Sequence, residues 1–467
     1  MVGRGQRYHL TRMKPDKSSR VRERQSPSGS RIPHVRLPGE SLETWLAREK
    51  NPLKRFFMLL GPGLVTGASD DDPSGIATYA QAGAGLGFSS LWTALFTFPM
   101  MWSVQFICAK IGMVTGSGLA RVLRKHYSRW LLYPVVAGLV VANTINAGVD
   151  IGAIAAAINL LVPIPIAALI VPIAICILVV QIWGSYRLIA KTFKWLTLAL
   201  FAYLVSAFFA KPDWSNVLKG TLLPALTFDR QFLVVLVGIL GTTITPYLFF
   251  WQADQEVEEE ISMGRRTLRQ RVGASAAELK CAEWDVASGM LFSNIVMYFI
   301  ILATASTLFK SGNTKIESAI QAAQALRPLA GNAAYLLWAP GLIGAGVLCV
   351  PILTGSAAYA TAEAMGWKHG LDERPRRAKL FYGMITLSTL VGMLINFVGI
   401  NPMTALFWTA VINGFLAPPI LVVVMLIANN KSVLGEHVNG PVSNAIGWAT
   451  TVTMSVAAIA LALARAR

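Results

Sequence analysis

The chain has 467 residues, of which 54% are hydrophobic and only 14% are charged, and its formal net charge is +17. Soluble proteins carry roughly 25% charged residues, so this composition, with a mean hydropathy of +0.53, excludes an ordinary soluble domain. Apolar runs of about 20 residues recur and predict a polytopic all-α membrane protein. The four cysteines, Cys108, Cys176, Cys281 and Cys349, have no zinc-ligand or redox spacing, so we interpret them as small packing residues.

The start of the chain differs in composition from the rest. Residues 1–50 are polar and basic and lack the apolar core of a signal peptide. We predict a disordered cytoplasmic arm, whose charge is explained by an anchoring role near anionic lipid without any nucleic-acid partner. Residues 51–467 then form the membrane domain.

Eleven apolar segments are long enough to cross a bilayer. Helices 1–5 are expected within residues 56–210, helices 6–10 within 231–427, and an extra helix at 444–464. The individual spans are predicted at about 56–85, 88–112, 130–161, 165–184, 193–210, 231–256, 285–308, 333–365, 379–398, 402–427 and 444–464.

The distribution of Lys and Arg residues predicts how these spans are oriented in the membrane. With the N-terminus inside, 32 of the 41 Lys and Arg residues fall in inside segments and 8 in outside segments. Because cytoplasmic segments are enriched in Lys and Arg, we predict an integral protein of the cell membrane with a cytoplasmic N-terminus and an external C-terminus. The lipid bilayer is its surroundings, and no obligate protein partner is implied.

The first span contains a run of acids, SDDDPSGIATY, at residues 69–79. A charge at the bilayer centre is unfavourable by several kcal/mol, and Pro73 and Gly75 both weaken a helix. We therefore expect the span to break at 70–75, since non-helical backbone persists at that depth only where it lines a cavity or is buried in protein. For Asp70 and Asp71 two roles stay open, the gathering of cations at the entrance and simple solvation.

The sixth span has a matching break at GTTITPY, residues 241–247. If helices 1–5 and 6–10 form two inverted repeats, spans one and six occupy corresponding positions, and paired broken helices there point to a midplane ion or substrate site. A simple proline kink could explain Thr245-Pro246 alone, but not acids and breaks in both positions. We therefore expect a cation to pass at the two breaks.

The motifs in these segments resemble the NRAMP family of divalent-metal transporters. The resemblance rests on GPGLVTGASDDDPSGIATYAQAGAGLGFSSLW in the first span, AKIGMVTGSGLA at 109–120 and GTTITPY at 241–247. It implies the inverted-repeat fold of sodium-coupled amino-acid transporters, with broken helices 1 and 6. It also implies a metal site between these two helices, with the metal as transported substrate and no cofactor.

The departures from the family pattern fall on the metal ligands. The first-helix motif Asp-Pro-Gly-Asn becomes Asp72-Pro73-Ser74-Gly75, so the ligand Asp is kept and the ligand Asn is replaced by Gly75. The ligand Met of the sixth helix falls on Thr245, and the residue that supplies a backbone carbonyl falls on Thr242. By this resemblance the metal is expected at Asp72, Gly75, Thr242 and Thr245.

Further positions are expected to lie around the site. Tyr247 and Gln252 replace two family histidines, and the two third-helix acids associated with proton movement fall on Asn146 and Val149. Candidates for contact with hydrated metal are the side chains of Asp71, Tyr247, Asp150 and Asn413. The acidic run DQEVEEE at 254–260 is interpreted as a solvated cytoplasmic helix end, with a role in metal exit as the alternative.

The chemistry of these replacements predicts a hard cation. A thioether favours transition metals, and Thr245 offers oxygen in its place, while Gly75 is expected to widen the site. Mg²⁺ keeps several waters and binds one or two carboxylates, so the pattern resembles the NRAMP-related magnesium transporter branch, with Mn²⁺ also accepted. The five histidines all lie outside the predicted spans, so we expect transport without protons.

Three alternatives remain at the level of the sequence. The first is a proton-coupled Mn²⁺ or Fe²⁺ symporter of the same family. The second is a transporter of the same fold for an organic substrate, which the acids at the break disfavour because carboxylate substrates need a free helix N-terminus. The third and most remote is an intramembrane aspartyl enzyme, which needs a second catalytic acid that helix 6 lacks.

Overall fold

The structure is a computed structural model, and it describes residues 61–184, 201–227, 229–371 and 373–465. The predicted arm at 1–50 lies outside the described residues, as do 56–60 of the first span and 193–200 of the fifth. Within the described ranges every regular element is helical, which confirms the all-α fold class.

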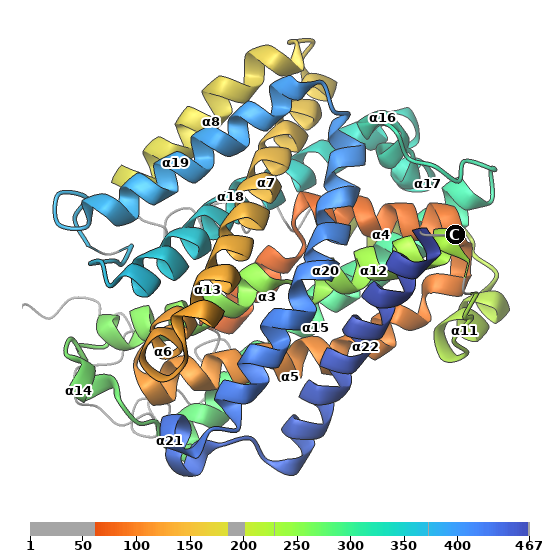
Figure 1. The fold of residues 1–467 in the computed structure, drawn as a ribbon. Helices are drawn as coiled ribbons and strands as arrows, with labels where there is room; N and C mark the ends of the chain where they lie inside the picture. Colours follow the sequence, from red (N-terminus) through yellow and green to blue (C-terminus); the bar gives the residue numbers. More distant parts are fainter. Residues whose placement is uncertain (1–60, 185–200, 228, 372, 466–467) are drawn as a thin grey trace, which may run out of the picture. The chain divides into compact units, whose positions relative to one another are not determined.

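The first repeat contains a broken helix followed by four further spans and their connections (Figure 1). Its elements are α3 (Pro62–Asp70), α4 (Pro73–Leu86), η1 (Gly87–Ser90), α5 (Trp92–Thr115), α6 (Leu119–His126), α7 (Arg129–Leu161), α8 (Ile166–Trp183), α10 (Phe201–Phe209) and the connecting α11 (Trp214–Leu222).

The second repeat also begins with a broken helix, and one extra helix, α22, closes the chain. The elements are α12 (Arg230–Thr243), α13 (Pro246–Ser262), α14 (Leu268–Arg271), α15 (Ala276–Thr304), η3 (Ala305–Phe309), α16 (Ala319–Ala323), η4 (Gln324–Leu326), α17 (Arg327–Ala330), η5 (Gly331–Ala333), α18 (Ala334–Met365), α19 (Lys379–Ile395), η6 (Asn396–Val398), α20 (Pro402–Ala428), α21 (Lys431–Leu434), η7 (Gly435–His437) and α22 (Pro441–Arg465).

Nine helices in the described ranges are long and apolar enough to cross a membrane. The first predicted span is not among them; it is divided into α3 and α4, which have 9 and 14 residues. The fifth is represented by α10 alone, since the beginning of that span lies outside the described residues. With these two added, the helices follow the eleven predicted segments.

Both helix breaks are observed, and they share a local cause. Asp72 (φ −68°, ψ 166°) and Thr245 (φ −93°, ψ 134°) are extended and directly precede Pro73 and Pro246, which begin α4 and α13. A proline ring disfavours helical backbone in the residue before it but fits the first turn of a helix. The sequence therefore ends one half-helix and starts the next at each of these positions.

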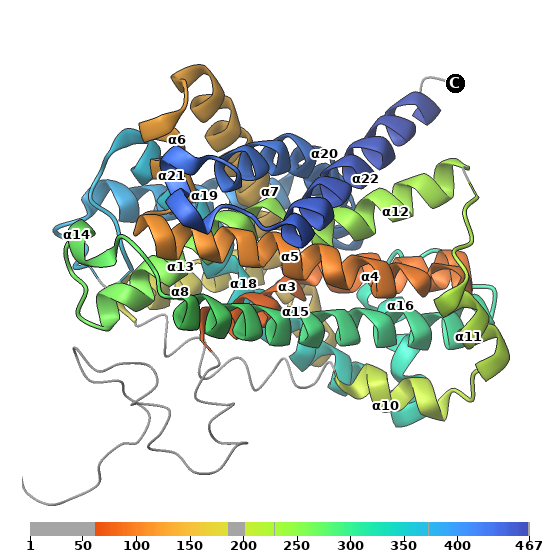
Figure 2. The same ribbon diagram turned by 90° about the horizontal axis from the view of Figure 1, so that it is seen from below.

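The half-helix α3 is held by α15, which lies against α3, α4 and α5 (Figure 2). The Asp285 carboxylate accepts hydrogen bonds from the backbone N–H groups of Gly61 (2.8 Å), Gly63 (2.7 Å) and Leu64 (3.1 Å). These groups have no partner within the helix, so Asp285 supplies the missing acceptor. A Cβ atom at Gly67 would overlap the α15 backbone, so this close approach requires glycine.

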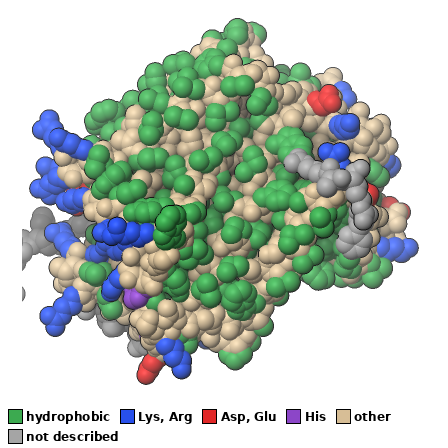
Figure 3. Space-filling model, viewed as in Figure 1, with side chains coloured by type: hydrophobic (Ala, Val, Ile, Leu, Met, Phe, Trp, Pro, Cys, Tyr) green, Lys and Arg blue, Asp and Glu red, His purple; other side chains and the backbone are tan. Residues whose placement is uncertain are grey.

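The outer surface has the character of a membrane protein. Hydrophobic side chains cover the middle of the face in Figure 3, and Lys and Arg side chains gather at the edge that carries α6 and α14. The helices α8 and α19 lie side by side (Figure 1) and expose large apolar side chains, for example Ile175 and Leu394. Such exposure is typical of lipid-facing helices.

Candidate metal site

The carboxylate of Asp72 lies at the break between α3 and α4 and is buried, with 1% of the residue exposed. Its Oδ1 accepts hydrogen bonds from the Gly75 backbone N–H and from Ser74 Oγ (2.8 Å). Its Oδ2 accepts one from Asn146 Nδ2 of α7 (3.0 Å). All three donors are neutral, and no Lys, Arg or His in the described ranges pairs with this acid. The carboxylate is therefore oriented by hydrogen bonds while its charge is left without a protein counter-ion.

Two further side chains meet Asp72 from other helices. Asp150 of α7 and Cys349 of α18 are fully buried, and one ligand atom from each of the three residues lies within 4.8 Å of the other two. Both Asp150 carboxylate oxygens lack a hydrogen-bond partner in the described chain. Burying such a group without a partner is unfavourable, so two carboxylates at this distance form a site that a divalent cation would stabilise.

Two of the predicted ligand positions are Thr245 at the sixth-helix break and Gly75 at the first break. Thr245 Oγ1 is buried without a hydrogen-bond partner among the described residues. A Cβ atom on Gly75 would lie 3.0 Å from Thr242 Oγ1, 3.2 Å from Asp72 Oδ1 and 3.3 Å from the Asp70 carbonyl oxygen. The expectation that Gly75 widens the site compared with an asparagine stays a prediction, and in this conformation even a Cβ atom there would be in tight contact with the Thr242 hydroxyl and the Asp72 carboxylate.

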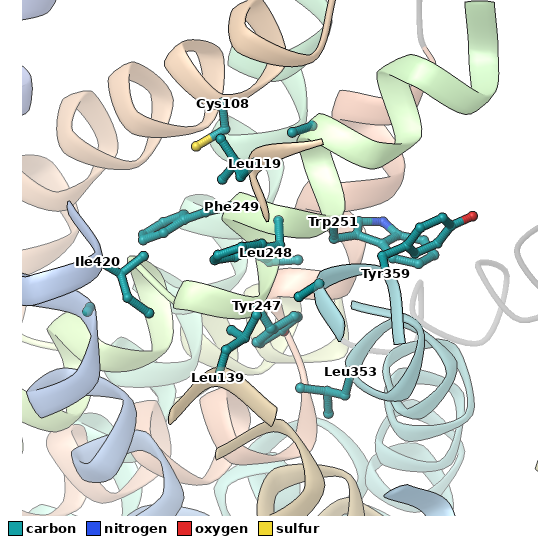
Figure 4. Close-up of a cluster of buried hydrophobic side chains, with 14 of the residues drawn as sticks. Cys108, Leu119, Leu139, Tyr247, Leu248, Phe249, Trp251, Leu353, Tyr359 and Ile420 are labelled. Atoms are coloured by element: carbon teal, nitrogen blue, oxygen red, sulfur yellow. The ribbon is translucent and has the colours of Figure 1, made fainter. Parts of the chain in front are cut away.

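Tyr247 links the two broken helices to α18. Its hydroxyl donates to the Ser69 carbonyl at the end of α3 (3.0 Å) and lies 3.5 Å from Cys349 Sγ. Its own carbonyl accepts a hydrogen bond from Ser356 Oγ (2.9 Å). In Figure 4 the ring lies close to apolar side chains that include Leu139. Tyr247 is thus in contact with Cys349, a member of the group with Asp72 and Asp150, while its contact with a hydrated metal stays a prediction.

The other two acids of the run turn to α15 instead. Ser293 Oγ contacts Asp70 Oδ2 (2.7 Å) and Asp71 Oδ1 (3.1 Å), and both acids are buried. Their solvation, one of the two roles left open, is excluded by this burial. Asp71 is not in the group formed with Asp150. Asn413 of α20 is buried as well, and its place at the site stays a prediction because no hydrogen bond in the described residues joins it to Asp72.

Three of the five acids in the run at 254–260 are buried, so the expectation of a solvated helix end is wrong for these three. Asp254, Glu256 and Glu260 are 2%, 5% and 4% exposed. Asp254 lines a cavity of about 180 Å³ together with side chains of α6 and α18, and its Oδ2 has no hydrogen-bond partner in the described chain. The physical reason is that α13, which carries the run, packs against α5, α6 and α18.

Three residues beside the acids of the first break are absent from the predicted ligand set: Asn146, Cys349 and Ser293. The sequence identifies Asn146 only as the position of a lost acid, yet its side chain donates to Asp72; its position four residues before Asp150 indicates that the two side chains share a helix face. The sequence predicts Cys349 to be a packing residue, because its apolar neighbours give no sign of a ligand. Ser293 was likewise hidden in a predicted apolar span.

Comparison with known proteins gives one family and a set of similar folds. A model of the natural resistance-associated macrophage protein-like family, Nramp, matches residues 63–464. Two crystal structures of the manganese transporter of Eremococcus coleocola are similar, one of a variant (TM-score 0.70) and one in complex with an aromatic bis-isothiourea substituted compound (TM-score 0.69). Each is 16% identical and covers 88% of this chain and 87% of that chain.

A transporter of another family has a related fold. The structure of Mhp1, a nucleobase-cation-symport-1 family transporter in a closed conformation with bromovinylhydantoin bound, matches with a TM-score of 0.54 and 14% identity. The match covers 87% of this chain and 92% of that chain. At these identities the likeness concerns the fold, and it agrees with the two repeats and two broken helices described above.

Proposed function

This chain belongs to the natural resistance-associated macrophage protein-like family, and from that premise we propose that it carries Mg²⁺ across the membrane, accepts Mn²⁺ as well, and moves them without protons. The family is one of divalent-metal transporters, so the protein is a metal transporter and not an enzyme. The proposal concerns which ion is carried and what drives it.

The observation that carries the proposal is the pair of buried carboxylates, Asp72 and Asp150, with ligand atoms within 4.8 Å of each other and no protein cation between them in the described chain. Two negative charges match one divalent cation. Mg²⁺ prefers oxygen ligands and is usually held by one or two carboxylates with several waters retained. Asp72 and Asp150 would supply the charge, and the unpartnered hydroxyl of Thr245 would supply a neutral oxygen.

The breaks themselves favour a cation. The C-terminus of α3 lies close to Asp72 in the sequence, and the C-terminus of α12 lies close to Thr245. The carbonyl groups at the C-terminus of a helix carry partial negative charge. A thioether at the position of Thr245 would favour softer metals. Its replacement by a hydroxyl supports selection of the harder Mg²⁺ and Mn²⁺.

The driving force is proposed to be the ion gradient and the membrane potential. None of the chain's five histidines falls in a predicted span, and the family's third-helix acids are represented by Asn146 and Val149. The Asn146 amide is already engaged as a donor to Asp72. A membrane potential of 100 mV contributes about 2.3 kcal/mol per charge, doubled for a divalent ion, which suffices for uptake down the electrical gradient.

The test is uptake into proteoliposomes with Mg²⁺, Mn²⁺ and Ca²⁺ supplied in parallel, the membrane potential clamped, and a pH-sensitive dye inside. We expect uptake of Mg²⁺ and Mn²⁺ above that of Ca²⁺, with no metal-dependent acidification. Uptake of Mn²⁺ without Mg²⁺, together with acidification, would instead support the proton-coupled symporter of transition metals. Competition by amino acids would support a transporter for an organic substrate.

A further inference from the structure

Cys349 of α18 is part of the buried hydrophobic core, but unlike Cys108, which belongs to the same core, it also lies beside two carboxylates. Its Sγ belongs to the group of ligand atoms with Asp72 and Asp150, all within 4.8 Å of one another. The Asp150 carboxylate is fully buried, and neither of its oxygens has a hydrogen-bond partner in the described chain. An unpartnered acid beside the sulfur is an independent sign that something besides the protein completes this group.

The hydrogen bonds around the sulfur leave its lone pairs available. Tyr247 has one hydroxyl hydrogen, and it is donated to the Ser69 carbonyl (3.0 Å). In the 3.5 Å contact between Tyr247 and Cys349 the thiol is therefore the donor and the tyrosine oxygen the acceptor. A thiol whose hydrogen points to Tyr247 can direct its lone pairs toward the carboxylates.

We propose that Cys349 is a sulfur ligand of this metal site and lets it bind soft divalent cations, with Cd²⁺ as the probe, more tightly than its oxygen donors alone would. The inference rests on the proposed metal site but concerns a different property of it. Mg²⁺ has little affinity for sulfur and uses the carboxylates, whereas softer metals bind thiolates. As the Cd–S bond forms, the S–H bond breaks and its proton passes to water.

The chain offers a matched control. Cys108 of α5 is also fully buried and belongs to the same hydrophobic core as Cys349, with apolar side chains such as Leu119 close by (Figure 4). It is not in the group with Asp72 and Asp150. A cysteine that merely fills space should therefore behave like Cys108, and a ligand should not.

The experiment measures Cd²⁺ and Mg²⁺ binding to the purified full-length protein. The more accessible thiols are first removed as Cys176→Ala and Cys281→Ala, so that they contribute no Cd²⁺ signal. Binding is followed by calorimetry and by the ultraviolet charge-transfer absorption of a cadmium–thiolate bond. In this background Cys349→Ser and Cys349→Ala are compared with Cys108→Ala.

We expect the background protein and Cys108→Ala to show the cadmium–thiolate absorption. Cys349→Ser should lose this absorption and bind Cd²⁺ at least about 10-fold more weakly, which is the smaller effect expected when a residue that supports a metal site is replaced. Its affinity for Mg²⁺ should change little. The absence of the absorption in the background protein, or its persistence in both Cys349 variants, would overturn the inference. In the Cys108→Ala protein Cys349 is the one cysteine that remains, so the presence or absence of the absorption there decides the matter even if both Cys349 variants fail to fold.

Failure of the proposed function gives a different pattern. Cd²⁺ binding that depends on Cys349 without any Mg²⁺ binding would reject Mg²⁺ as substrate while the sulfur ligand stands. Mg²⁺ binding without a Cys349-dependent Cd²⁺ signal would reject the sulfur ligand alone. Binding of neither metal would reject both.

Discussion

Replacing Asp72 by Asn removes one negative charge from the site while its shape is kept. The new side chain retains an oxygen for the Gly75 N–H and for Ser74 Oγ. Its amide nitrogen would face the Asn146 Nδ2 donor, but Asn146 Oδ1 has no partner in the described chain. If the Asn146 side-chain amide rotates so that its Oδ1 faces the new amide nitrogen, a hydrogen bond between the two side chains is restored. We therefore expect the variant to keep the fold.

The loss of metal binding follows from the charge. Two unit charges about 4 Å apart interact by about 4 kcal/mol at the effective dielectric constant of about 20 that suits proteins, and a divalent ion doubles this to about 8 kcal/mol. Water that replaces the lost carboxylate offsets part of this lost attraction. A net loss of about 3 kcal/mol is about 100-fold in affinity, so transport at low metal concentration should nearly cease.

The assay compares initial rates of Mg²⁺ and Mn²⁺ uptake into proteoliposomes for wild type, Asp72→Asn and Glu436→Gln. Glu436 is exposed in η7, so its substitution changes the charge equally without touching the site. Thermal unfolding in detergent checks that all three proteins are equally stable. Uptake by a well-folded Asp72→Asn protein at a rate comparable to wild type would refute the placement of the metal at this acid.

Three further substitutions and one control substitution test other contacts. Asn146→Ala removes a donor to Asp72, and we expect roughly 10-fold weaker metal affinity with unchanged thermal stability; a shifted melting temperature with normal affinity would assign it a structural role. Asp285→Ala deprives three backbone N–H groups of their acceptor and should lower stability by about 3 kcal/mol, measured by thermal unfolding. Gly67→Ala should destabilise by about 1–3 kcal/mol or more because its Cβ overlaps the α15 backbone, whereas Gly383→Ala, which meets open space, should leave stability unchanged or raise it by about 1 kcal/mol. Equal melting temperatures for the two glycine variants would contradict the close packing of α3 on α15.

The sequence by itself determined the helices and their two breaks. The length of each apolar segment predicts a membrane span, and a proline restricts the backbone of its own residue and of the residue before it. For this reason the breaks at Asp72-Pro73 and Thr245-Pro246 follow from the order of residues in each short segment. The family motifs lie in the same short segments, which is why Asp72 is recognisable in the sequence as the central acid.

Only the tertiary structure decided what surrounds Asp72. Asp150 and Cys349 come from α7 and α18, far away along the chain, and they meet Asp72 because those helices pack beside the first break. The packing of α13 against α5, α6 and α18 likewise buries Asp254, where the sequence indicated a solvated helix end. Local rules fix the backbone of each segment, but ligand sets and burial depend on which helices become neighbours, and no short stretch of sequence contains that information.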